Sequence, residues 1–272
     1  ENTVNALMAA YKSADLQTKQ YIVYALGLIG IPKSVTNLLD ILKDEKSQVS
    51  YKTVAFSLKR VSDDRLLTNL QRLITEPSAY IKQAAAYTLG VIGEAKSINV
   101  LITQINDASE EVRKTVIEAL GRIGGESIVD PLAKMLRDQS DSVREIAVKI
   151  MGGLNSARSL EPLTPALKDS SEAVRINAIN ALGKLKDNRV PMNLLRLLKD
   201  ASEKVREAAI FTLGNIKDQR AGESLIESLS DQSENVRRQA VEALGKIGSL
   251  AAVVPLLNML TDANSLVRIK AF

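Results

Sequence analysis

The sequence predicts an all-α protein, built as an α-solenoid of about nine two-helix repeats. Three observations carry this prediction: a Val-Arg pair recurs every 31 residues, an Asp keeps the same step just before it, and leucine columns follow the same period. A fixed period of this length is typical of stacked repeats, because one helix pair cannot bury its apolar face without a neighbour. The pairs begin at Val112, Val143, Val174, Val205, Val236 and Val267, and the aspartates are Asp107, Asp138, Asp169, Asp200, Asp231 and Asp262.

The elements of one repeat follow from its residues, and the fourth repeat is typical. The first helix is predicted over 98–105, where apolar residues recur at i, i+3, i+4 and i+7. Asp107-Ala108 makes a short turn, and Ser109 is a good N-cap because its hydroxyl accepts a hydrogen bond from a free amide. The second helix carries its apolar face on Val112, Val116, Ala119, Leu120 and Ile123, and Gly124 supplies the left-handed residue that ends it.

The same pattern along the chain predicts a single repeat domain over 1–272. We expect repeats at 1–30, 31–61, 62–93, 94–124, 125–155, 156–186, 187–217 and 218–248, and an incomplete one at 249–272. The first three are degraded, and Ile81-Lys82 takes the place of Val-Arg in the third. Pro165 lies beyond the first turn of its predicted helix, so we expect it to kink or shorten that helix.

Composition excludes most classes of enzyme. The 272 residues include no Cys and no His, which removes the thiolate nucleophile, the usual zinc ligands and the commonest general base. Neither a Walker-type phosphate loop nor a G-x-G-x-x-G motif occurs. We therefore expect no catalytic residue, no metal and no cofactor. No apolar run of about 18 residues occurs, so membrane insertion is not expected either.

The segment Asp107-Ala-Ser-Glu-Glu-Val-Arg, continued to Gly124, resembles the short HEAT-like repeat, the type also found in phycobilisome lyase subunits. The likeness spans the whole chain. It implies a right-handed superhelix whose second helices line a concave face where partners bind. It also implies that the turn Asp and the Arg of the second helix form a hydrogen-bonded structural ladder along the stack. The ladder residues are Asp107, Arg113, Asp138, Arg144, Asp169, Arg175, Asp200, Arg206, Asp231 and Arg237.

A glycine column runs late in the second helices, where Gly costs about 1 kcal/mol relative to Ala. Its regular step indicates that helices cross closely there, rather than that a ligand approaches. The column consists of Gly90, Gly121, Gly152, Gly183, Gly214 and Gly245.

Candidate partner-binding residues lie at non-repeating positions of the second helices. Seven of the nine aromatic residues precede residue 88, and Tyr24, Phe56 and Tyr87 share one outward position in adjacent repeats. Aromatic residues are enriched at binding hot spots, although these could instead pack on each other or fill gaps in degraded repeats. Basic residues along the same helices would make this face positively charged. The alternative is a solvated face on which acidic and basic residues are mixed. The candidates are Tyr21, Tyr24, Lys52, Phe56, Arg60, Tyr87, Lys114 and Arg122.

The leading functional hypothesis is a non-enzymatic scaffold that binds a segment of another protein, with Arg60 and Arg122 engaging its acidic residues. One alternative is nucleic-acid binding through a weakly basic groove, as in HEAT-like DNA glycosylases, although the net charge of +4 is small. The other is a phycobilin-lyase-like subunit, although those are richer in aromatic residues. HEAT-repeat hydroxylases hold iron through His-Glu pairs, so the lack of His excludes that chemistry.

The C-terminal segment 265–272 carries an apolar stripe of Val267, Ala271 and Phe272 with nothing after it to cover the stripe. We therefore expect either that the chain belongs to a larger protein or that it self-associates through this end. We expect a cytoplasmic location.

Overall fold

The computed structural model describes residues 1–61, 63–185 and 187–271, and these contain eighteen α-helices and no strand. The all-α fold of stacked helix pairs predicted from the 31-residue period is confirmed. The chain divides into two compact units, unit 1 (Glu1–Pro131) and unit 2 (Leu132–Phe272). Whether both form one domain stays a prediction. Phe272, part of the expected C-terminal stripe, lies outside the described residues.

Unit 1 holds four helix pairs and the start of α9. Its helices are α1 (Asn2–Ser13), α2 (Leu16–Ile29), α3 (Pro32–Lys43), α4 (Tyr51–Leu58), α5 (Asp64–Leu73), α6 (Ala79–Ile92), α7 (Ile98–Thr103), α8 (Glu110–Ile123) and α9 (Val129–Met135).

Unit 2 continues with α10 (Asp141–Leu154), α11 (Leu160–Leu163), α12 (Glu172–Lys184), α13 (Val190–Leu195), α14 (Glu203–Ile216), α15 (Gly222–Glu227), α16 (Glu234–Ile247), α17 (Val253–Asn258) and α18 (Ser265–Ala271).

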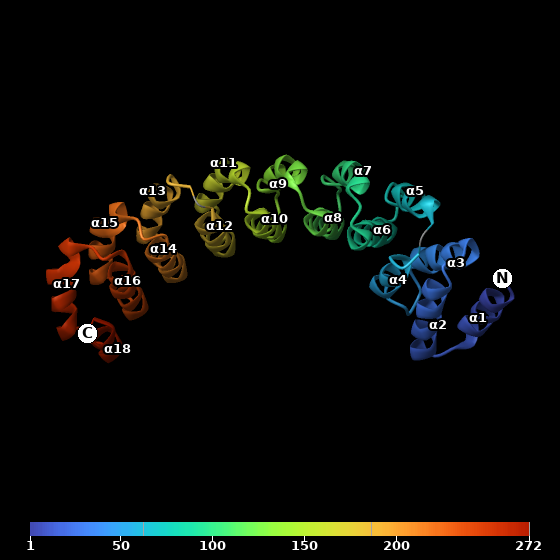
Figure 1. Cartoon of the computed structure of the whole chain (residues 1–272), viewed down its shortest axis with the longest axis horizontal. Helices are drawn as coiled ribbons and strands as arrows, with labels where there is room; N and C mark the ends of the chain where they lie inside the picture. The colour runs from blue at the N-terminus through green and yellow to red at the C-terminus, as the bar shows by residue number, and fades with distance from the viewer. Residues whose placement is uncertain (62, 186, 272) are drawn as a thin grey trace. The chain divides into compact units, whose positions relative to one another are not determined.

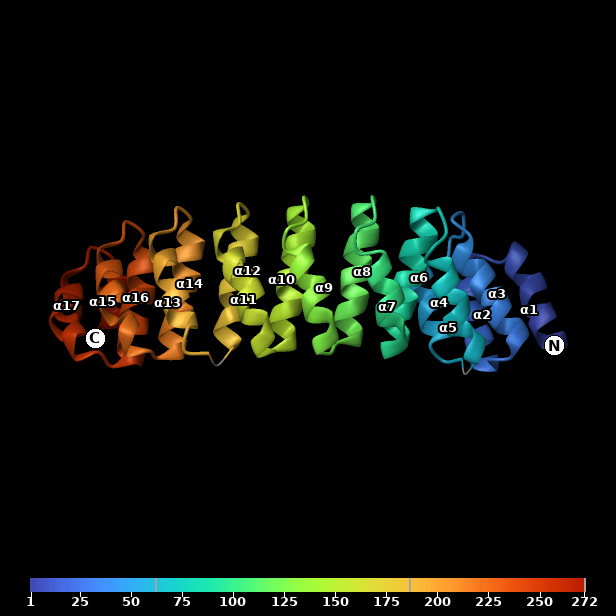
Figure 2. The same cartoon turned by 90° about the horizontal axis from the view of Figure 1, so that it is seen from above.

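The helices of each unit form two layers. Odd-numbered helices are the first members of the pairs and make one layer, and even-numbered helices make the other, on the concave side of the unit (Figure 1). Within a layer the helices of a unit lie side by side (Figure 2). The apolar faces meet between the layers, where residues such as Leu120, Leu182 and Leu213 are fully buried.

Serine caps begin most second helices as the sequence predicts. The hydroxyls of Ser109, Ser140, Ser202 and Ser233 each accept a hydrogen bond from the backbone N–H three residues on, at 3.4 to 3.5 Å. The preceding Asp supports the same turn, since the Asp231 carboxylate accepts the Ser233 N–H at 2.8 Å. Each second helix therefore starts at a position that its own turn residues determine.

The first helices of unit 2 are shorter than their apolar pattern suggests, because each changes to a 3-10 turn before the second helix. α13, α15 and α17 have six residues each and are followed by 3-10 segments that contain no proline. α11 has only four residues, and its 3-10 segment (Thr164–Lys168) has Pro165 in its first turn. Pro165 thus coincides with the shortest of these helices, but the change to 3-10 geometry occurs without it.

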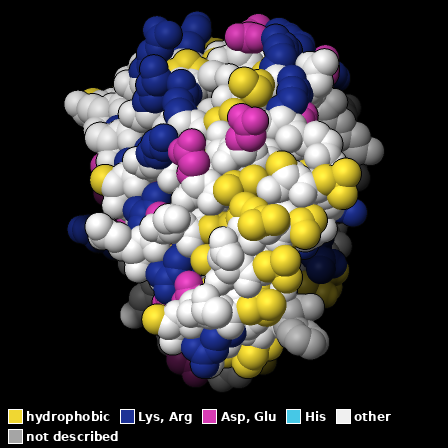
Figure 3. Space-filling model, turned by 90° about the vertical axis from the view of Figure 1, so that its left-hand side faces the viewer, with side chains coloured by type: hydrophobic (Ala, Val, Ile, Leu, Met, Phe, Trp, Pro, Cys, Tyr) yellow, Lys and Arg dark blue, Asp and Glu magenta, His cyan; other side chains and the backbone are white. Residues whose placement is uncertain are grey.

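The end of unit 2 formed by α17 and α18 exposes large apolar side chains, seen as yellow atoms in Figure 3. Leu250 is 88% exposed, Ile269 70% and Val254 65%. The self-association expected at this end stays a prediction. Over the described part of the chain, every helix is too short or too polar to cross a bilayer.

Candidate partner-binding surface

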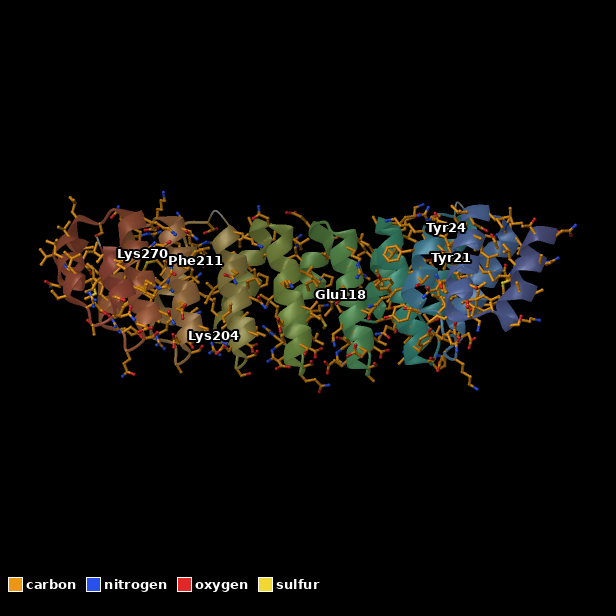
Figure 4. The ribbon with its side chains drawn as sticks, turned by 90° about the horizontal axis from the view of Figure 1, so that it is seen from below. Tyr21, Tyr24, Glu118, Lys204, Phe211 and Lys270 are labelled. Carbon is orange, nitrogen blue, oxygen red and sulfur yellow. The ribbon has the colours of Figure 1, made fainter. Side chains whose placement is uncertain are left out.

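Five large apolar side chains are exposed on neighbouring second helices of unit 1, and one of them, Leu16 at the start of α2, is 43% exposed. Tyr21, Tyr24 and Leu28 lie on α2 and are 64%, 46% and 59% exposed, and Phe56 on α4 is 56% exposed. We call these four residues the aromatic patch. Figure 4 labels Tyr21 and Tyr24 together on α2. Burying such side chains elsewhere in the fold would stabilise it by about 1.5 to 3 kcal/mol each, so their exposure marks this surface out.

The expectation that Tyr87 points outward is wrong, because this side chain is only 8% exposed. Its ring centroid lies 5.5 Å from that of Tyr51 and 6.4 Å from that of Phe56, both in edge-to-face geometry. The Arg122 guanidinium carbon lies 4.5 Å from the ring centroid. Tyr87 therefore supports the patch from below, as the centre of an aromatic cluster, and is not itself an accessible anchor.

The four expected cations of unit 1 separate into two kinds. Lys114 forms an ion pair with Glu111 at 2.7 Å, and this hydrogen bond raises the pKa of Lys114 above its ordinary value. Arg122 lies 3.7 Å from Glu118 on its own helix. A partner's carboxylate would have to compete with these local acids, so Lys114 and Arg122 contribute little free positive charge.

Lys52 and Arg60, by contrast, pair with aromatic rings. The Lys52 ammonium lies 5.7 Å from the Tyr87 ring centroid, and the Arg60 guanidinium lies 5.0 Å from the Tyr24 ring centroid. Both residues are exposed, and neither forms an ion pair with any side chain that the structure describes. The two cations therefore remain available to an acidic group from outside.

Among the described residues of unit 2, one aromatic residue is comparable: Phe211 on α14 is 48% exposed and is labelled in Figure 4. Lys246 lies over its ring at 5.2 Å and also pairs with Glu242 at 2.9 Å. Lys270 pairs with the same carboxylate at 2.9 Å, and hydrogen bonds from Lys270 and Lys246 lower the pKa of Glu242 to about 2. The cation over Phe211 is thus neutralised within the unit.

The Arg and Asp columns form a ladder of hydrogen bonds within unit 2. The Arg144 guanidinium donates to both carboxylate oxygens of Asp169, at 2.7 and 2.9 Å, and to the Asp138 carbonyl at 2.8 Å. Arg206 bonds Asp231 in the same way, and Arg237 bonds Asp262. Each arginine therefore joins its own turn to the turn of the next repeat.

Two ladder positions depart from this geometry. Arg175 donates only one hydrogen bond to Asp200, at 2.9 Å. In unit 1, Lys82 takes the arginine's place and donates to Asp107 at 2.6 Å. The Arg113 guanidinium donates to the Asp107 carbonyl at 2.9 Å, and Arg113 and Asp138 have further interactions.

A second ladder was missed in the sequence. The Glu172 carboxylate accepts the Ser202 hydroxyl at 2.7 Å, and the Glu203 carboxylate accepts the Ser233 hydroxyl at 2.6 Å. The signal was present, because these glutamates and serines keep the same 31-residue step as the Asp and Arg columns. Both ladders use polar residues to join repeats, and the described residues contain no cluster of acidic side chains able to hold a metal ion.

Several glycines of the column lie where a Cβ would clash with the next repeat. A Cβ added to Gly152 would lie 2.6 Å from the Ala181 Cβ, and one added to Gly90 would lie 2.6 Å from the Ala119 Cα. Second helices of adjacent repeats therefore cross closely at these glycines, whereas Gly245 of the same column has nothing within 4 Å of its added Cβ.

Comparison with known families agrees with this architecture. The family model for HEAT repeats matches residues 66–145, 129–202 and 190–272. The chain is a HEAT-repeat protein. Among solved structures, this HEAT-repeat chain is similar to YibA of Escherichia coli, with a TM-score of 0.62 and 24% identity, over 93% of this chain and 95% of that one. An engineered protein matches with a TM-score of 0.54 and 19% identity, over 100% of this chain and 87% of that one.

These similarities extend to the fold alone, because both identities are below 25%. No protein with a curated description matches the HEAT-repeat chain. Repeat folds of this kind present extended surfaces that bind other proteins.

Proposed function

We propose that this HEAT-repeat protein is a non-enzymatic scaffold that binds a segment of another protein on the second helices of unit 1. The observation that supports the proposal is the aromatic patch, which exposes Tyr21, Tyr24, Leu28 and Phe56 on two adjacent helices. Aromatic side chains that can be buried at the centre of an interface supply most of its binding energy.

The mechanism is binding to a preformed surface. Phe56 and the Tyr87 beneath it are held by the edge-to-face contacts of the aromatic cluster, and Tyr24 is held under the Arg60 guanidinium. Side chains that are already ordered lose little conformational entropy when a partner covers them. A partner segment can therefore bury apolar side chains against the patch while the scaffold pays little ordering cost.

The test is selection of peptides from a random displayed library. The full chain is the bait, and the same library is counter-selected against the variant Tyr24→Ala/Phe56→Ala. Both side chains are about half exposed, so their removal should leave the fold intact, which circular dichroism checks. Phe211→Ala is the matched control, since it removes an aromatic residue of similar exposure from unit 2.

Peptides that bind the wild type and Phe211→Ala, and that lose binding in the double variant, are the expected result. Selection that yields only peptides indifferent to Tyr24 and Phe56 would contradict the proposal, and so would repeated failure to enrich any peptide.

A further inference from the structure

Two cations that form no ion pair with a described side chain, Lys52 on α4 and Arg60 just after it, lie on either side of Phe56. Lys52 is four residues before Phe56 and Arg60 is four residues after it, so the three side chains follow one stripe of the helix and of the turn that ends it. At a rise of about 1.5 Å per residue, the two cations are separated by roughly 12 Å along the helix axis.

The cations also lean in opposite directions from α4. Lys52 reaches toward α6, where its ammonium lies 5.7 Å from the Tyr87 ring centroid. Arg60 reaches toward α2, where its guanidinium lies 5.0 Å from the Tyr24 ring centroid. The two positive charges thus mark the ends of a diagonal across α4, with the exposed Phe56 ring between them.

The rings do not replace an acidic partner for these cations. An exposed cation–π contact is worth about 0.5 to 1 kcal/mol and leaves the far side of the cation in water. The equivalent cation over Phe211 in unit 2, Lys246, is already paired with Glu242 at 2.9 Å. Among the described second helices, an exposed aromatic ring beside a cation that has no described ion-pair partner is therefore found in unit 1.

We propose that the aromatic patch binds an extended acidic segment in which two carboxylates flank one apolar residue at a spacing of two residues on each side. This inference rests on the proposed function and specifies the partner's chemistry. In an extended chain, residues i, i+2 and i+4 point to the same face and span roughly 13 Å. That span is close to the separation of Lys52 and Arg60 along the helix axis, and it places the central apolar residue over Phe56.

An amphipathic helix fits the same charges less well. A helix that docks in a groove presents apolar residues at i, i+3, i+4 and i+7, and so needs several apolar positions in a row. Between Lys52 and Arg60 the stripe offers one exposed apolar ring, Phe56. An extended segment requires one anchor between its two acids, which is what α4 provides.

The experiment measures binding of fluorescein-labelled synthetic peptides to the full chain by fluorescence polarisation. The acidic peptide is Asp-Ser-Trp-Ser-Asp between Gly-Ser flanks. The amide peptide has Asn in place of both Asp, the anchorless peptide has Ser in place of Trp, and a helical peptide places the two Asp eight residues apart around Trp in an Ala-rich frame.

The acidic peptide is expected to bind about tenfold more tightly than the amide peptide, since each of two exposed charge pairs contributes up to about 1 kcal/mol. This difference should vanish in Lys52→Gln/Arg60→Gln, and it should shrink as the salt concentration rises from about 50 to about 500 mM. Lys149→Gln/Lys184→Gln is the matched control, because it removes two exposed lysines from second helices of unit 2 and should leave the difference unchanged.

The outcomes separate the partner's chemistry from the function itself. Equal binding of the acidic and amide peptides, tighter binding of the helical peptide, or no binding of any peptide up to about 1 mM overturns the acidic extended segment. If the amide and acidic peptides bind equally and Phe56→Ala still weakens both, the proposed function stands and only the acidic partner is wrong. If Phe56→Ala changes neither, the patch is not the binding surface and both proposals fail.

Discussion

The Arg–Asp ladder allows a quantitative prediction for Arg206. Its guanidinium donates two hydrogen bonds to Asp231, at 2.8 and 2.9 Å, and one to the Asp200 carbonyl at 2.9 Å. The Arg206 and Asp231 side chains are only 16% and 13% exposed. Arg206→Gln therefore leaves a largely buried carboxylate without its counter-ion.

Two known magnitudes bracket the cost of this change. A hydrogen bond to a charged group is worth about 1.5 to 3 kcal/mol, and breaking a fully buried ion pair costs about 3 to 5 kcal/mol. Because Asp231 keeps its hydrogen bond from the Ser233 N–H, we expect Arg206→Gln to lower the free energy of unfolding by about 3 kcal/mol.

Arg175 is the matched comparison within the same ladder. It donates one hydrogen bond to Asp200 where Arg206 donates two to its aspartate, and the buried Arg175 Nε has no hydrogen-bond partner among the described residues. Its removal relieves that unsatisfied group, so Arg175→Gln should cost at least about 1 kcal/mol less than Arg206→Gln.

The assay is urea unfolding followed by far-UV circular dichroism for both variants, for Asp231→Asn and for the double variant with Arg206→Gln. The two single changes at Arg206 and Asp231 should be strongly non-additive, because each removes the same pair. Equal costs for Arg175→Gln and Arg206→Gln, or a cost below about 0.5 kcal/mol for Arg206→Gln, would refute the reasoning.

Three further predictions concern packing, backbone and pH. Gly152→Ala should lower the free energy of unfolding by about 1 to 3 kcal/mol, because its Cβ would meet Ala181 at 2.6 Å. Gly245→Ala in the same column meets nothing within 4 Å and should be neutral or stabilising. Urea midpoints of both variants test this difference. Lys217→Gly should raise the thermal midpoint, because Lys217 ends α14 with φ of 60°, where glycine is unstrained. Urea midpoints should fall on acidification, because partial burial alone would raise the pKa of ladder aspartates such as Asp169 and Asp231, but hydrogen bonds from their arginines outweigh it and hold the pKa below the ordinary 3.8. The stabilisation from these aspartates is present above that value and is lost as the pH falls through the lower pKa of the folded state. An unchanged midpoint at strongly acidic pH would contradict this.

Most of the fold was predictable because each repeat specifies its own ends. Serine caps such as Ser140 and left-handed glycines such as Gly93 determine where the second helices begin and end, and both residues are visible in the sequence. The last turns of the first helices were not predictable. Choosing between i→i+3 and i→i+4 hydrogen bonds depends on small backbone rotations set by packing, and the apolar period does not encode them.

The candidate surface was predictable in position and less so in exposure. Tyr24, Phe56 and Tyr87 share one column, so the period places them alike, and two of the three are exposed. Tyr87 is buried because the half-buried Tyr51 from α4 and Arg122 from α8 both cover its ring. A single column cannot show how long side chains from other columns lean, whereas the pairing of Lys114 with Glu111, three positions earlier on the same helix, was open to prediction from the sequence.

The regular step of the ladder and of the glycine crossings has a consequence for how such a chain can change length. Arg144 and Asp169 are 25 positions apart, as are the other Arg–Asp pairs of unit 2, so excising 31 residues such as 172–202 re-creates the same relations. Arg206 would then donate to the Asp169 carbonyl, and Gly152 would face Thr212, which another glycine of the column already accommodates. Loss or duplication of one whole period is thus a nearly silent event for the packing, while loss of a fraction of a period breaks the contacts between the two repeats on either side of the cut.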